Sequence, residues 1–102
     1  MEKIKVLSDK IEDEIRDAEE YAKLALDCKD EDPATAEVYY KLANEEIGHA
    51  NMLHSRVVAL IEAYKKDSGD IPEPMQMVYN ILHKKHIENM ATARSLLLIY
   101  KG

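Results

Sequence analysis

Three side chains with metal-binding chemistry occur at positions where a helical sequence should be apolar. Glu46 and His49 form a Glu-x-x-His pair, and residues three apart lie on the same face of a helix. Glu14 takes a similar position earlier in the chain, between Ile11 and Ala18. Because burying a charge is costly unless the charge is paired or bound to a metal, these three residues are candidate metal ligands.

The elements that must position these residues are long helices. The 102 residues include only 3 Gly and 3 Pro, and this scarcity of turn residues excludes a strand-rich fold. We expect one all-α domain over residues 1–102, with helices at about residues 2–29, 33–67 and 73–100. Turn residues separate the helices at 30–33 and 68–74, where Asp32 is a candidate cap and Pro33 suits the first helical position.

Each predicted helix carries one stripe of residues at alternating spacings of three and four, which is typical of a helix in a bundle. In the first helix the stripe consists of Ile4, Leu7, Ile11, Glu14, Ala18, Tyr21, Ala25 and Cys28. In the second it consists of Tyr39, Leu42, Glu46, His49, Leu53, Arg56, Leu60 and Ala63. In the third it consists of Tyr79, Leu82, His86, Met90, Ala93, Leu97 and Tyr100.

The short break at residues 30–33 predicts an antiparallel hairpin of the first two helices. Glu14 and Glu46 lie at comparable distances from this break, so the hairpin brings them to similar depths. One Glu from one helix and Glu-x-x-His from its neighbour make half of the ligand set of a di-metal site in a four-helix bundle. A homodimer with a two-fold axis would supply both the missing helices and the missing ligands.

The same residues have structural interpretations. Glu-x-x-His is a short motif in a Glu-rich sequence, so Glu46 could be a surface residue and His49 a core histidine. Tyr21, seven residues after Glu14, is either ordinary core or a residue that hydrogen-bonds to a metal ligand. His83 and His86 in the third helix could bind a metal, but two lysines separate them, and a packing or surface role is favoured.

Composition also bounds the partners. The net charge of −6 argues against nucleic acid, and a single cysteine, Cys28, excludes a disulfide within the chain. The first residues alternate in charge and contain no secretory segment, and no apolar run approaches the roughly 18 residues of a membrane span. We therefore expect a cytoplasmic protein that does not enter the membrane.

The run Asn44–Met52, together with Glu14 and Tyr21, resembles the encapsulated ferritins, a compact branch of the ferritin-like superfamily. The resemblance covers roughly residues 12–63. It implies a ferroxidase that oxidises Fe(II) to Fe(III) with O₂ or peroxide, for iron storage or detoxification. It implies Glu14, Glu46 and His49 as ligands of two iron ions per dimer interface, with Tyr21 near the iron. It also implies a ring-like homo-oligomer inside a separate encapsulin shell.

Some features depart from that family or leave alternatives open. Gly48 inside the Glu-x-x-His pair costs about 1 kcal/mol relative to Ala in a helix, and close approach of another helix is one explanation. Asp13 and Asp17 match the acidic residues that flank the family's first ligand, but Arg16 lies among them. A Glu/His site also accepts Mn, Zn or Ca. The alternatives are a rubrerythrin-like peroxide-reducing di-iron protein and a non-catalytic helical oligomer or adaptor.

Overall fold

The computed structural model describes residues 2–102, and over this range it contains three α-helices and no strand. α1 spans Glu2–Cys28, α2 spans Pro33–Ser68 and α3 spans Glu73–Lys101. The predicted all-α class is confirmed, and each predicted helix boundary agrees with the structure to within one residue. The four-helix bundle formed by two copies stays a prediction.

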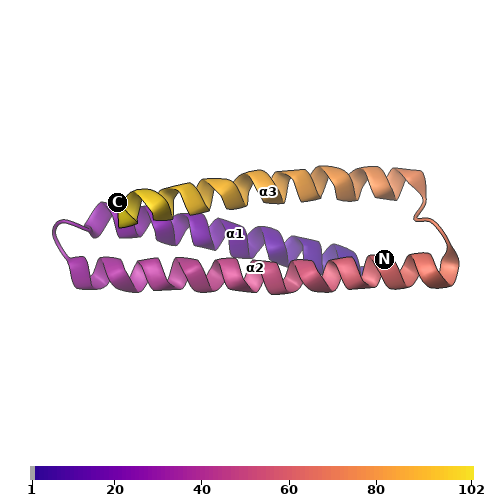
Figure 1. The fold of residues 1–102 in the computed structure, drawn as a ribbon, viewed down its shortest axis with the longest axis horizontal. Coiled ribbons are helices and arrows are strands. Elements are labelled where there is room, and N and C mark those ends of the chain that lie inside the picture. Colours follow the sequence, from indigo (N-terminus) through magenta and orange to yellow (C-terminus); the bar gives the residue numbers. More distant parts are fainter. Residues whose placement is uncertain (1) are drawn as a thin grey trace.

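The three helices lie nearly parallel in a thin rod of 56 × 18 × 17 Å (Figure 1). α1 and α2 form the predicted antiparallel hairpin, and α3 then returns along α1, ending beside the loop that joins α1 to α2. Both α2 and α3 pack on α1, whereas α2 and α3 hardly touch each other. One side of the α1–α2 pair is therefore covered by α3, and no other described element covers the opposite side.

Capping interactions define where α2 begins and ends. The Asp32 carboxylate accepts a hydrogen bond from the Thr35 backbone N–H at 3.1 Å and another from the Thr35 hydroxyl at 2.6 Å. Pro33, in the first turn, has no N–H that would need a partner. At the other end Gly69 adopts a φ of 83°, which favours glycine, and its N–H caps the Lys65 carbonyl at 3.0 Å. The predicted roles of Asp32 as a cap and of Pro33 as the first residue of α2 are therefore confirmed.

α1 carries two adjacent buried stripes rather than one. The predicted stripe residues Ile4, Ile11, Ala18 and Ala25 are buried, and Leu7, Glu14, Tyr21 and Cys28 are half-buried at its border. The second stripe, which was not predicted from the sequence, consists of Ser8, Ile15 and Ala22. Two stripes on one helix give α1 room for two neighbours, which is why α3 can pack on it beside α2.

The predicted stripe of α2 is wrong by about one position. The buried residues of this helix are Ala36, Ala43, Ile47, Ala50 and Val57. Of the predicted residues, Tyr39, Leu42, Glu46, Leu53 and Leu60 are half-buried, and His49, Arg56 and Ala63 are exposed. The reason is that α1 and α2 meet through alanines, so the contact is centred on small side chains and the leucines border it. In α3 the prediction is confirmed for His86, Ala93, Leu97 and Tyr100, which are all buried.

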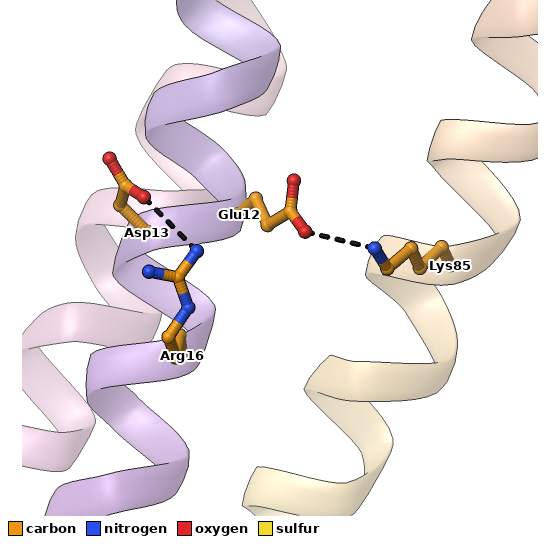
Figure 2. A network of polar contacts seen from close by, with 4 residues as sticks. All are labelled: Glu12, Asp13, Arg16 and Lys85. Atoms are coloured by element: carbon orange, nitrogen blue, oxygen red, sulfur yellow. Dashed lines mark hydrogen bonds and ion pairs between the residues drawn. The ribbon is translucent and has the colours of Figure 1, made fainter.

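Polar contacts also connect α3 to α1. Lys85 donates to Glu12 at 2.9 Å across the two helices, while Arg16 pairs with Asp13 at 3.3 Å within α1 (Figure 2). Near the end of α3, the Lys29 ammonium donates to the Tyr100 carbonyl, and the Tyr100 hydroxyl donates to Glu37 at 3.0 Å. Exposed ion pairs contribute at most about 1 kcal/mol each, so apolar packing rather than charge holds the rod together.

The alanine contact between α1 and α2 predicts that a larger side chain at this contact lowers the stability of the protein. Ala43→Leu should lower the free energy of unfolding by about 1–3 kcal/mol, because Ala43 is fully buried against α1 and a larger side chain must push the helices apart. Ala59→Leu is the matched control, since Ala59 is exposed on the same helix and its change should stay within about 0.5 kcal/mol. Chemical denaturation of both variants measures the difference, and equal costs would contradict the packing.

Candidate metal centre

Glu14, Glu46 and His49 converge in the structure. Each offers one ligand atom, and these three atoms all lie within 4.8 Å of one another. His49 Nδ1 is 3.6 Å from Glu14 Oε2 and 3.6 Å from Glu46 Oε1. The antiparallel hairpin brings Glu14 of α1 beside the Glu-x-x-His pair of α2, as the sequence predicted.

The spacing suits a shared ion better than a direct hydrogen bond. A distance of 3.6 Å is longer than an ordinary N–H···O hydrogen bond. Two ligand atoms that each lie about 2.1 Å from one ion, at a tetrahedral angle, are about 3.4 Å apart. The imidazole is therefore separated from each carboxylate by almost the distance expected between two ligands of a common cation.

The cluster lies on the side of the α1–α2 pair that α3 leaves uncovered. We call this side the open flank; it comprises Leu7, Glu14 and Tyr21 of α1 with Glu46, His49 and Leu53 of α2. The exposed fraction of the side chain is 26% for Glu14, 17% for Glu46 and 53% for His49. The carboxylates are thus largely shielded, while the imidazole still faces outwards, where a further ligand or a second protein surface can approach.

The two carboxylates perturb each other. A hydrogen bond with the Glu14 carboxyl, partial burial and the negative charge of Glu14 together raise the pKa of Glu46 to about 7, against the opposing effect of His49. Two carboxyl groups that are close together and partly shielded oppose each other's ionisation. Binding of a divalent ion would remove this repulsion.

Tyr21 lies on the open flank but outside the three-residue cluster. It is two helical turns, or about 10 Å, further along α1 than Glu14. Its ring stacks against Tyr39 of α2, with ring centroids 6.1 Å apart and planes inclined by 25°. Tyr21 therefore has the packing role that the sequence allowed, and its hydrogen bond to a metal ligand stays a prediction.

The structure also shows the surroundings of Gly48 and Asp13, two residues that the sequence singled out. A Cβ added at Gly48 would meet no atom within 4 Å, so no neighbouring helix of the same chain accounts for this glycine. Asp13, a candidate for guiding ions inwards, is paired with Arg16 on the surface of α1 (Figure 2). Part of the charge of that carboxylate is therefore already compensated.

The histidines of α3 lie close to a histidine of α2, and the sequence predicted only part of this arrangement. His86 is buried and His83 is exposed, which matches the favoured packing and surface roles. His54 of α2 was not among the predicted site residues, but its ring stacks on that of His83 with centroids 4.9 Å apart. No spacing in the sequence links residues 54 and 83, because their proximity depends on where α3 lies.

Comparisons with known proteins do not identify the chain, since no family model, curated protein or solved structure matches it. The resemblance to encapsulated ferritins is therefore carried by Glu14, Tyr21 and the Asn44–Met52 run alone. None of the helices over residues 2–102 has a stretch long and apolar enough to cross a lipid bilayer.

The raised pKa of Glu46 predicts a pH dependence of stability in protein treated with a chelator. The folded state favours protonated Glu46, so this contribution is complete below its ordinary pKa of 4.5 and is lost as the pH rises to about 7. Glu46→Gln should remove this loss and stabilise the protein at pH 8 by on the order of 1–2 kcal/mol, allowing for partial solvent screening.

Unfolding measured at pH 5 and pH 8 checks this expectation. Glu45→Gln is the control, because Glu45 is exposed on the same turn and should leave the pH dependence unchanged. If Glu46→Gln shows the same pH dependence as the parent, the two carboxyl groups are not coupled as the structure places them.

Proposed function

We propose that this protein binds Fe(II) as a substrate at a site shared by two copies of the chain and oxidises it to Fe(III). The observation that carries the proposal is the convergence of Glu14, Glu46 and His49 within 4.8 Å on the open flank. The resemblance to encapsulated ferritins agrees with this site residue by residue. It also suggests iron, rather than Mn, Zn or Ca, as the ion.

One chain supplies only half of such a site. Three ligand atoms do not fill the coordination of two ions, whereas two copies related by a two-fold axis would supply four carboxylates and two imidazoles. The four negative charges would balance the four positive charges of two Fe(II) ions. Completion of the site and pairing of the chains are thus one event in this proposal.

The surface around the cluster supports a second copy as the partner. Leu7 and Leu53 on the open flank are only half-buried. Val38 and Met52 of α2 lie about three turns before and one turn after the exposed His49, and both are themselves exposed. Such apolar groups beside an outward-facing ligand suit an interface with the same surface of another copy.

The residues have separate tasks in the reaction. Glu14 and Glu46 bind and bridge the ions, and His49 completes the coordination while leaving positions open for the oxidant. Two Fe(II) ions each lose one electron, and one O₂ takes both electrons with two protons to give hydrogen peroxide. With peroxide as the oxidant, the same two electrons and two protons yield two water molecules. The Fe(III) product would then pass to a storage compartment of the encapsulin type.

Glu46→Ala is expected to slow Fe(II) oxidation at pH 7 by at least about tenfold, because it removes a ligand from each half of the site. It should also abolish any iron-dependent increase in oligomer size. Absorbance of Fe(III) over time and size-exclusion chromatography with and without Fe(II) measure the two effects. Glu45→Ala, one residue away and exposed, is the control and should behave as the parent.

The outcomes separate the alternatives. Unchanged oxidation by Glu46→Ala would show that the site assignment is wrong. Rapid peroxide consumption with iron retained on the protein would indicate a rubrerythrin-like peroxide reductase. Protein that oligomerises without iron and neither binds nor oxidises it would indicate a non-catalytic oligomer, in which Glu14, Glu46 and His49 determine the register of the helices.

A further inference from the structure

A second group of metal-binding side chains lies on the other side of the α1–α2 pair. The chain has 4 His, and three of them, His54, His83 and His86, line the same two cavities where α3 passes α2. His49 and His54 are five residues apart on α2, so they point about 140° away from each other around the helix axis. This cluster, which we call the histidine groove, is therefore distinct from the site on the open flank.

His86 gives the groove an unexplained polar atom. The residue is only 7% exposed, and its Nε2 atom is buried without a hydrogen-bond partner among the described residues. Burial lowers the pKa of His86 and also that of His54. A neutral imidazole keeps a lone pair that can bind a metal. Buried polar atoms normally have partners, so an unpaired one points to a missing ligand.

The groove has room for an ion and its water. Two cavities, of about 220 and 470 Å³, lie along it, and the three histidines line both of them together with Ile11. The rings of His54 and His83 lie almost parallel, inclined by 14°, so they stack rather than converge on a point. Because His83 is exposed, its side chain is free to turn, and on α3 it lies one helical turn from His86.

The charges around the groove select the kind of ligand. No carboxylate lines either cavity. The other polar residues are Ser8, Gln76, Tyr79 and Asn80 in the narrower cavity, and Asn51, Arg94 and Ser95 in the wider one. Glu12, the acidic group that acts on His86, is paired with Lys85 at 2.9 Å. Ions that require oxygen ligands, such as Ca²⁺ and Mg²⁺, find little here, whereas imidazole suits Zn²⁺, Cu²⁺ and Ni²⁺.

We propose that His54, His83 and His86 form a second metal site, which takes a divalent transition ion such as Zn²⁺ through three imidazoles. The ion satisfies the buried Nε2 of His86 and replaces the stacking of His54 on His83. It also joins α2 directly to α3, two helices that otherwise hardly touch. The site is separate from iron oxidation and does not depend on the function proposed above.

The test uses the full chain with Glu46→Ala and His49→Ala together, so that the open flank no longer binds. Calorimetric titration with Zn²⁺ should show one ion per chain, and Zn²⁺ should raise the melting temperature. In this background, His83→Ala and His54→Ala should each weaken binding at least about tenfold and abolish the rise in melting temperature. Both variants alter residues outside the buried core, so folding is retained and can be checked by circular dichroism.

His49→Ala alone is the matched control, because it removes the fourth histidine but leaves the groove intact and should keep the Zn²⁺-dependent stabilisation. Absence of Zn²⁺ binding in the Glu46→Ala, His49→Ala protein would overturn the proposal. Binding that survives both His83→Ala and His54→Ala would also overturn it, since the ion would then lie elsewhere. A failure here leaves iron oxidation untouched, because that reaction is measured on the parent chain and with Glu46→Ala.

Discussion

Close packing of α1 on α2 through alanine side chains is the constraint on which the rest of the structure depends. Ala18 of α1 and Ala43 of α2 are completely buried in one cluster, which Ala22 of α1 and the α3 residues Ala93 and Leu97 also join. Small side chains let two helix backbones approach, and only at a short separation can Glu14 and His49 bring their ligand atoms to 3.6 Å. The alanines therefore do not bind anything, but they determine the distance between the groups that can.

The same packing creates an electrostatic cost. Two carboxyl groups that are partly shielded and in contact cannot both ionise freely, and the pKa of about 7 for Glu46 reflects this conflict. A protein that had no use for a cation here would be more stable with an apolar residue at one of these positions. In the proposed function, an ion bound between these carboxyl groups and His49 would relieve this repulsion.

The sequence was sufficient for much of this arrangement. The scarcity of Gly and Pro, the cap at Asp32 and the break near Gly69 located all three helices, since such signals are local. Glu14, Glu46 and His49 could be brought together because a short loop favours an antiparallel hairpin and the two glutamates lie at similar distances from it. The side of the hairpin that α3 covers could not be predicted, because that choice depends on the second stripe of α1, at Ser8, Ile15 and Ala22. For the same reason His54 was missed, and the stripe of α2 was placed on the leucines rather than on the alanines.

The thinness of the rod has a consequence for how this chain tolerates change. With a cross-section of 18 × 17 Å, no large side chain is fully enclosed, and among the described residues only alanines lie completely out of contact with water. Removing methyl groups from Val57 or Leu97, which are 8% and 6% exposed, therefore opens a notch at the surface rather than an empty internal cavity, and solvent fills it. Such truncations lose the transfer free energy of the removed atoms but little of the additional penalty that a sealed void imposes. Replacing these slightly exposed apolar residues by smaller ones should thus cost little stability. The alanines between the helices, in contrast, cannot be replaced by larger residues without pushing the helices apart.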